Sequence, residues 1–297
     1  MRLAVIACFL NEESYLPTFL ESVACQTRQP DRLLLVDDGS VDGSLRLAQE
    51  FAVSRADVLA LSRPQRPPQR DRLATAAELE AFCWAIEQLD LPWQVVAKLD
   101  ADMSLSPDLF AELELRLEAD PRLGIAGAIQ SLRLPDGRLV RERCPANHVR
   151  GSTKFYRREC FEEISPLAFR LGWDTTDEVR ARMSGWGTQS FSMPSGDPIH
   201  LRPTSTADGA LRGYRRNGTA AYAYGASFWW VSLGAVGRLG DRPRVLGGLS
   251  LLQGWLTARL RGYPRADARQ RAFLAGEHRS RAREALRRLV RRLDAAS

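Results

Sequence analysis

The first half of the chain alternates between short apolar stretches and amphipathic ones, and this alternation constrains the fold more than any other feature. Strand patterns fall at 2–9, 32–36, 57–61 and 94–99. Helical spacing of apolar residues fills the intervals, at 14–25, 42–53 and 73–89. Alternation of this kind predicts an α/β domain with a mainly parallel sheet flanked by helices on both faces.

The patterns become less regular further along. The segment 62–72 holds three prolines and four arginines, which predicts a surface loop over the strand ends. Beyond it we expect helices at 107–119, 153–164 and 174–183, and strands at 124–132, 137–143 and 188–193. A turn is expected at 135–137, where proline, aspartate and glycine follow one another.

Two acidic pairs stand directly after expected strands. Asp37 and Asp38 follow the second strand, and Asp100 and Asp102 follow the fourth. Ligands of open α/β sheets bind outside the carboxyl ends of the strands, so both pairs should face one crevice. Close carboxylates repel each other unless a cation lies beside them, and oxygen ligands suit Mg²⁺ or Mn²⁺ on a substrate diphosphate. The alternative is a plain strand-to-helix loop capped by Ser106; the shared crevice favours the metal–diphosphate site.

Two common nucleotide motifs are missing from the chain. The turn after the first strand contains no glycine, which argues against an NAD or FAD site, and no GxxxxGK[ST] sequence is present. The second strand is followed by a turn in which Gly39 permits a tight bend and Asp42 can cap the next helix. An aspartate here can accept an N–H from uracil or guanine.

Four motifs stand in an order that resembles glycosyltransferase family 2. They are FLNEE at 9–13, LLLVDDGSVDGS at 33–44, AKLDADM at 97–103 and GWDTTDEVRARMSGW at 172–186. The resemblance covers about residues 1–200 and implies a GT-A fold. It also implies an inverting transfer of a sugar from a nucleotide-diphosphate sugar to an acceptor hydroxyl, with Mg²⁺ or Mn²⁺ as cofactor.

The resemblance also implies roles for residues in the first two motifs, which in this family hold the nucleotide. The first motif contributes Phe9, Asn11 and Glu12. In the second, Asp38 matches the aspartate that reads the base, and Asp37 stands beside it.

The diphosphate side of the site is implied in the same way. Asp100 matches the ribose-facing position and Asp102 the metal ligand. Arg72 matches a basic position on the nucleotide side of some members. His200 is a candidate third metal ligand or diphosphate contact, with a structural role as the alternative, and Arg202 is a candidate diphosphate clamp.

A later acidic residue on a helix is the general base of this family. Many members have Glu-Asp at this point, with an arginine six residues after the Asp; here Asp174 lies six before Arg180, and Trp173 replaces the Glu. Asp177 is the runner-up and Glu178 is expected to be structural. The alternative for all three acids is favourable charge at a helix N-terminus.

Two rival functions stay open. A sugar nucleotidyltransferase would normally carry a glycine-rich, basic loop after the first strand, and this chain has none. The other rival is a membrane scaffold that binds nucleotide sugars without catalysing transfer. The replacement of the usual Glu by Trp173 is compatible with this rival. The QxxRW motif of processive synthases is absent, so we expect a single sugar to be added, to a glycan or lipid-linked acceptor in bacterial cell-envelope or extracellular glycan synthesis.

The second half has a different character. Stretches 217–237 and 245–258 carry no charge, and from Trp255 onwards there are twelve arginines against four acidic residues. We therefore divide the chain into a catalytic domain at 1–210 and a helical, membrane-associated extension at 211–297. We expect an interfacial or re-entrant helix pair, with Trp229, Trp230 and Trp255 near the lipid headgroups and the basic tail on anionic lipid. Burial against the domain or in a dimer is the alternative.

The cellular setting follows from cysteine usage and the N-terminus. Five scattered cysteines without CxxC spacing are typical of reduced thiols. The N-terminus enters a strand pattern directly, so no cleavable signal peptide is expected. We expect a cytoplasmic protein, peripheral at the inner face of the cell membrane, with no nucleic-acid partner.

Overall fold

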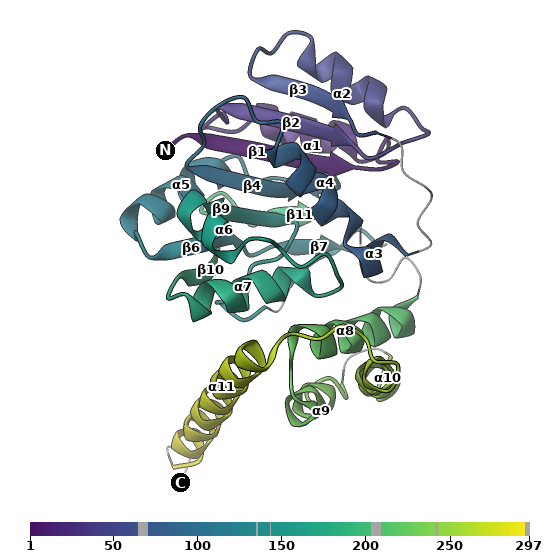
Figure 1. The fold of residues 1–297 in the computed structure, drawn as a ribbon, viewed down its shortest axis with the longest axis vertical. Coiled ribbons are helices and arrows are strands. Elements are labelled where there is room, and N and C mark those ends of the chain that lie inside the picture. Colours follow the sequence, from purple (N-terminus) through teal and green to yellow (C-terminus); the bar gives the residue numbers. More distant parts are fainter. Residues whose placement is uncertain (65–70, 135, 143, 203–208, 241–242, 295–297) are drawn as a thin grey trace. The chain divides into compact units, whose positions relative to one another are not determined.

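The computed structural model describes the 297-residue chain apart from residues 65–70, 135, 143, 203–208, 241–242 and 295–297. The chain divides into two compact units, Met1–Thr204 and Ser205–Ser297 (Figure 1). The domain assignment of 1–210 and 211–297 stays a prediction, because a division into compact units does not test whether each part folds or works alone.

A seven-stranded sheet forms the centre of the first unit, in the order β10-β6-β9-β4-β1-β2-β3. Its strands are β1 (Leu3–Phe9), β2 (Arg32–Asp37), β3 (Val58–Ser62), β4 (Val95–Asp100), β6 (Leu123–Ala128), β9 (Thr153–Arg157) and β10 (Gly187–Phe191). Only β9 runs antiparallel to its neighbours, β4 and β6. The sheet is therefore mixed and mostly parallel, as the alternating pattern predicts.

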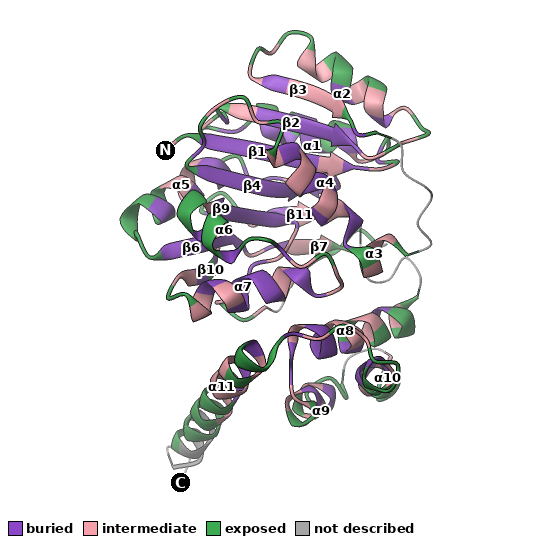
Figure 2. Ribbon diagram, in the orientation of Figure 1, coloured by how far each residue is buried: buried purple, intermediate pink, exposed green. Residues whose placement is uncertain are grey.

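Helices cover both faces of this sheet (Figure 2). They are α1 (Leu16–Ala24), α2 (Ser44–Ala52), α4 (Ala77–Ile86), α5 (Leu109–Ala119), α6 (Arg158–Ile164) and α7 (Trp173–Met183). The short α3 (Arg72–Thr75) has no buried residue and packs against α4. Successive side chains of a strand point to opposite faces, so β1 divides its residues between two cores. Val5 packs with Phe19 and Phe110 on one face, and Ile6 packs with Phe82 and Tyr156 on the other.

One sequence prediction is wrong in the middle of the sheet. The stretch 153–164, expected as a single helix, forms strand β9 and only then helix α6. The strand is central and buried, and it contains the strand-forming residues Phe155 and Tyr156. Lys154 stands directly before these two aromatic residues and interrupts the apolar pattern. A buried charge is rare in a strand, so the sequence did not predict one here.

Two further elements were expected to be continuous and are not. Helix 73–89 breaks at Ala76, whose φ is 52°, into α3 and α4. Strand 124–132 ends at Ala128, and Ser131–Arg133 forms β7 in a second sheet. That sheet has the order β5-β11-β7-β8, with β5 at Met103–Ser104, β11 at Ile199–His200 and β8 at Leu139–Arg141.

The second unit consists of α8 (Ala210–Tyr224), α9 (Phe228–Val236), α10 (Leu246–Leu260) and α11 (Ala268–Asp294). Helices α8 and α10 pack very closely: a Cβ on Gly254 would lie 2.0 Å from the carbonyl oxygen of Arg215. Small residues permit this approach of two backbones. Most of the basic tail forms α11.

The structure corrects the expected position of one tryptophan, Trp255. Trp255 is 2% exposed, and its indole N–H donates to the carbonyl of Ala226 at 3.1 Å. The ring of Trp230 stacks on His278 with 4.2 Å between centroids. Trp255 therefore belongs to the core of the helical unit, whereas Trp230 is half-buried and Trp229 is 40% exposed. Among the described residues, no helix combines the length and hydropathy needed to cross a bilayer.

Candidate active site

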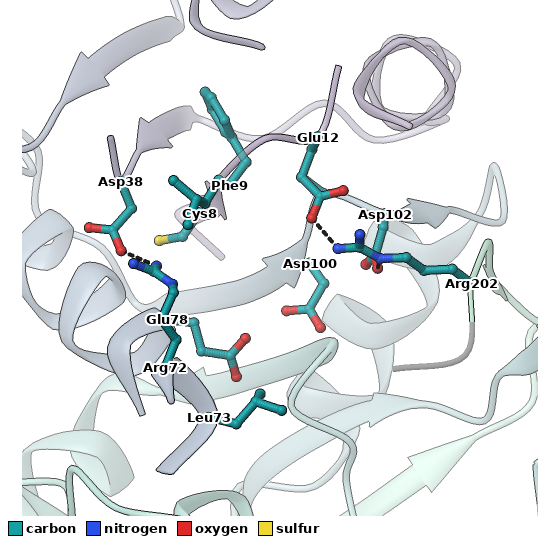
Figure 3. Close-up of a pocket in the computed structure, with 12 residues that line it drawn as sticks. Cys8, Phe9, Glu12, Asp38, Arg72, Leu73, Glu78, Asp100, Asp102 and Arg202 are labelled. Atoms are coloured by element: carbon teal, nitrogen blue, oxygen red, sulfur yellow. Dashed lines mark hydrogen bonds and ion pairs between the residues drawn. The ribbon is translucent and has the colours of Figure 1, made fainter. Parts of the chain in front are cut away.

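The carboxyl ends of β1, β2 and β4 meet at a cleft of about 770 Å³, including space open to solvent. Its polar lining consists of Glu12, Asp38, Arg72, Glu78, Asp100, Asp102 and Arg202 (Figure 3). Cys8, Phe9, Leu10, Leu73 and Ala101 supply the apolar lining. The cleft therefore brings acidic and basic groups from separate parts of the sequence to one place at the sheet edge.

Two of the expected nucleotide-binding residues shape the turns and do not line the cleft. The carboxylate of Asp37 accepts hydrogen bonds from the backbone of Ser40, at 3.0 Å, and of Gly39, at 3.3 Å. Asn11, with φ of 56°, accepts a hydrogen bond from the backbone of Val41 at 2.8 Å. Asn11 therefore ties the loop after β1 to the loop after β2.

Asp38 is held by two arginines. Its Oδ1 lies 2.6 Å from a guanidinium nitrogen of Arg63, and its Oδ2 pairs with Arg72. Arg63 is only 4% exposed, so this pair lies below the surface of the cleft. The side chain of Asp38 thus has a fixed orientation at the position expected to read the base.

Asp100, Asp102 and His200 form a compact group of candidate metal ligands. One ligand atom from each lies within 4.8 Å of the others. The second sheet explains the geometry, because β11 pairs with β5 immediately after Asp102 and places His200 opposite Met103. His200 Nε2 lies 3.2 Å from Asp102 Oδ2. Two carboxylates and one imidazole fit Mn²⁺, and the carboxylates also fit Mg²⁺.

Arg202 links two acids across the mouth of this group (Figure 3). Its Nε donates to Asp102 Oδ2 at 2.8 Å, and a terminal nitrogen pairs with Glu12. Burial raises the pKa of Glu12 to about 7, although Arg202 opposes the shift. For Asp102, burial acts in the same direction, but hydrogen bonds from His200 and Arg202 outweigh it and lower the pKa. Asp102 is therefore held as a carboxylate, ready to bind a cation.

The two lysines of the chain are neighbours on one face of the sheet. Lys98 on β4 and Lys154 on β9 are direct register partners, and they are 1% and 0% exposed. Like charges placed opposite each other destabilise a sheet unless each is neutralised. Lys98 pairs with Asp100 and donates to the carbonyl of Gly151 at 3.0 Å.

Lys154 fixes the helix that carries the candidate base. Its ammonium donates to both carboxylate oxygens of Asp177, at 3.0 and 3.1 Å, and to the backbone carbonyl of Asp174. Glu178 lies 3.3 Å away, and the Tyr156 hydroxyl donates to Asp177. These contacts hold the first turn of α7 against β9.

The two candidate bases differ in exposure. Asp177 is 2% exposed and its carboxylate is enclosed by the contacts just described; burial raises its pKa to about 6, although Lys154 opposes the shift. Asp174 is half-buried at the start of α7, and its charge contributes to the raised pKa of the cleft residue Glu78. Asp174 is thus the more exposed of the two candidate bases, and neither is among the residues that line the cleft.

Trp173 occupies the position of the Glu that many members place before the base. Its ring centroid lies 5.5 Å from the ammonium of Lys98 and 5.3 Å from that of Lys154. Such contacts with a ring face are attractive for cations. Gly151 makes room for the ring, since a Cβ there would lie 3.0 Å from it. The departure from the usual motif is accommodated by this local packing.

Four charged residues of this region were not predicted from the sequence: Arg63, Glu78, Lys98 and Lys154. Lys98 left a readable signal, because it interrupts an apolar strand with a charge that must find a buried partner. Lys154 left none, since the sequence TKFYR around it does not form an apolar run. Arg63 and Glu78 left none, since each stands in or near a polar stretch.

The fold and the cleft define an α/β protein with a cluster of acidic and histidine ligands and a basic clamp at the carboxyl ends of its strands. Residues 4–169, more than half of the chain, match the family model of Glycosyl transferase family 2. The chain belongs to this family and is a nucleotide-sugar glycosyltransferase. Family membership thus decides against the nucleotidyltransferase, whereas a catalytically silent scaffold would keep the same family fold and is tested by the transfer assay.

Solved structures with the same fold are glycosyltransferases of low sequence identity. A mannosyltransferase from Pyrobaculum calidifontis, in complex with GDP-Man and Mn²⁺, is 14% identical with a TM-score of 0.55, over 93% of this chain and 79% of that one. GalNAc-T7 with UDP, GalNAc and Mn²⁺ is 14% identical with a TM-score of 0.55, over 79% and 51%. TarS of S. aureus with UDP-GlcNAc is 14% identical with a TM-score of 0.50, over 89% and 74%. These similarities establish the GT-A-like fold alone.

One characterised relative aligns over a short stretch. It is a cholesterol galactosyltransferase from Borreliella burgdorferi, 37% identical over 51 residues. The aligned stretch is 17% of this chain and 14% of that protein, so it carries no information on substrate for the whole chain.

Proposed function

We propose that this protein is an inverting, metal-dependent glycosyltransferase that moves one sugar from a nucleotide-diphosphate sugar to an acceptor hydroxyl. The observation that carries the proposal is the group formed by Asp100, Asp102 and His200, with Arg202 bonded to Asp102. A cation site beside a guanidinium suits a diphosphate, which needs positive charge on both sides.

In this proposal the donor lies across the carboxyl ends of β1, β2 and β4. Asp38 reads the base, Asp100 contacts the ribose, and Phe9 and Glu12 line the same pocket. Asp102 and His200 hold Mn²⁺ or Mg²⁺, and Arg202 contacts the diphosphate. The structural neighbours crystallised with UDP, UDP-GlcNAc or GDP-Man support a UDP or GDP donor.

Asp174 is the proposed general base. It accepts the proton of the acceptor hydroxyl as the hydroxyl oxygen attacks the anomeric carbon, opposite the leaving diphosphate. This single displacement inverts the anomeric centre. Arg202 offsets charge that develops on the leaving group, and a bound divalent cation would supply the same electrostatic stabilisation more strongly. Lys154 keeps the base in place through the backbone of α7 and through Asp177.

The acceptor is proposed to be a glycan or lipid-linked hydroxyl of the cell envelope. A Cβ on Gly151 would lie 3.9 Å from the Cβ of Asp174, so the loop before β9 lies beside the proposed base.

A thermal-shift screen tests the donor site directly. UDP and GDP, each with Mn²⁺, should raise the melting temperature of the wild-type protein, since a ligand that binds the folded state stabilises it. The shift from the preferred nucleotide should be lost in Asp102→Asn and retained in Asp136→Asn, an exposed acid on a distant turn. A shift of equal size in the Asp102→Asn protein would contradict the assigned site.

A further inference from the structure

Helices α9 and α10 expose an unusual amount of apolar surface. Among the described residues, ten large hydrophobic side chains between 228 and 260 are exposed, against seven in the whole of 1–204. We call this surface the α9–α10 face; its most regular members are Trp229, Leu233, Val236, Leu249, Leu256 and Leu260. Apolar patches of this extent are uncommon on monomeric soluble proteins and mark interaction sites.

These side chains form one stripe on each helix. On α9, Trp229, Leu233 and Val236 follow the spacing i, i+4, i+7, which places them on one side. The other side of α9, with Val231 and Ala235, is buried in the core of the unit. The helix is therefore apolar on its buried side and on its exposed side, unlike a water-facing surface helix.

Helix α10 repeats this arrangement beside α9. Leu249, Leu256 and Leu260 are 56%, 43% and 85% exposed, whereas Trp255 on the opposite side is 2% exposed. The two helices are in contact, because a Cβ on Gly248 would lie 3.4 Å from the Cβ of Ala235. Two neighbouring helices thus present apolar stripes to the outside.

The charge around this face has one sign. The described residues from 210 to 263 include no Asp or Glu, while Arg238, Arg244, Arg259 and Arg261 are all exposed there. Over Ser205–Ser297 the sequence has 18 arginines and six acidic residues, a net charge of +12. A second copy of the chain would bring the same excess of positive charge, so charge opposes self-association through this face.

We propose that the α9–α10 face is a peripheral docking surface for a bilayer that contains anionic phospholipid. Leucine, valine and tryptophan side chains would enter the boundary between headgroups and acyl chains, with the helices parallel to the membrane plane. Arginine stems lie along the apolar surface while their guanidinium groups stay at the phosphates. All residues of this face belong to the second unit and none is assigned to the transfer chemistry, so membrane binding needs no substrate.

Vesicle flotation of the full-length protein tests this surface, with phosphatidylcholine vesicles compared with phosphatidylcholine–phosphatidylglycerol vesicles. The wild type should bind the anionic vesicles and bind less as NaCl rises. Leu233→Ser/Leu249→Ser should weaken this binding by about tenfold or more, since two apolar insertions are lost. The matched control Val53→Ser/Leu115→Ser removes two residues exposed by 86% and 57% elsewhere and should bind as the wild type does.

A charge variant keeps the test decisive if the serine variant fails to fold. Arg238→Gln/Arg244→Gln should bind anionic vesicles about tenfold or more less tightly and show a shallower dependence on salt. Light scattering measures the oligomeric state and so tests whether a second copy of the chain, instead of a bilayer, covers the α9–α10 face. A wild-type dimer that becomes monomeric in Leu233→Ser/Leu249→Ser, a wild type that binds neither kind of vesicle, or equal binding to both kinds would each overturn the proposal.

Discussion

The two units of the chain use charge in opposite ways. Met1–Thr204 has 24 basic and 30 acidic residues, and its most buried charges form close pairs such as Lys154 with Asp177. Ser205–Ser297 has 18 arginines against six acidic residues, and arginines at its surface stand beside exposed leucines. Paired charges inside a cleft orient groups for chemistry, whereas unbalanced charge on a surface attracts a partner of opposite sign. Changes in one unit should therefore leave the function of the other intact.

The largest expected effect comes from the proposed base. Asp174→Asn keeps the shape of the side chain but cannot accept a proton, so transfer should fall by about 10²–10⁴-fold. Vesicle binding, which depends on the other unit, should stay at the wild-type level. The readout is sugar transfer and flotation on the same preparation. An Asp174→Asn protein that retains wild-type turnover would remove the base assignment and shift it to Asp177.

The next largest expected effect is on the free energy of unfolding, and it differs between the two buried lysines. Lys154→Met leaves Asp177 and Glu178 buried without a cation, which should lower the free energy of unfolding by about 3–5 kcal/mol. Lys98→Met should cost less, because its partners Asp100 and Glu78 are 21% and 40% exposed and reach water. Urea unfolding measures both. Equal losses would show that the burial of the carboxylates does not set the cost.

Lys154→Arg tests the positioning role of Lys154 more finely. It keeps the charge, so much of the stability should return. The longer, planar guanidinium cannot reproduce the contact with the Asp174 backbone, so transfer should remain below the wild-type rate. Full recovery of both stability and transfer would reduce Lys154 to charge neutralisation alone.

The packing of the helical unit gives a smaller effect with a matched control. Gly254→Ala places a methyl group 2.0 Å from the Arg215 carbonyl oxygen and should destabilise that unit by about 1–3 kcal/mol. In α11, Gly276→Ala meets nothing within 4 Å and should be neutral or stabilising by up to about 1 kcal/mol. Thermal unfolding followed by circular dichroism measures the two changes. Donor binding should be unchanged in both variants.

The smallest effect is a dependence of stability on pH. Asp177 has a pKa of about 6 in the folded protein, above its ordinary 3.8, so the folded state takes up this proton first as the pH falls. The contribution of Asp177 to the free energy of unfolding therefore increases as the pH falls from about 6 to about 4. The slope is at most about 1.4 kcal/mol per pH unit for one proton. Asp177→Asn should remove this part of the slope. If the dependence of stability on pH were the same in Asp177→Asn and the wild type, the raised pKa of Asp177 would be contradicted.

Much of the first unit could be predicted from the sequence, because local patterns decide it. Parallel strands are buried on both faces and appear as continuous apolar runs, and the acidic motifs follow directly after them. Strand β9 could not be predicted, because Lys154 is neutralised by Asp177 and Glu178, which come from a helix more than twenty residues later. The proximity of His200 to Asp102 depends on the pairing of β11 with β5, which no local sequence pattern predicts.

In the second unit the sequence indicated apolar helices but not which residues they bury. Trp255 looked like a headgroup anchor and lies in the core, because the close packing of α8 on α10 at Gly254 turns it inward. The exposed leucines beside it are the residues that remain for a partner. A charge-free stretch shows that a helix is apolar, but which of its sides is buried depends on tertiary packing.

The release of nucleoside diphosphate from a panel of UDP- and GDP-sugars, with Mn²⁺ present, tests the central claim most directly. The account predicts that the wild type releases UDP or GDP, not pyrophosphate, from at least one donor in the presence of acceptor extracts. It also predicts loss of this release in Asp102→Asn and in excess EDTA, while Asp136→Asn stays active. Release that persists unchanged in EDTA and in Asp102→Asn would contradict the assignment of Asp100, Asp102 and His200 as the cation site of the transfer reaction.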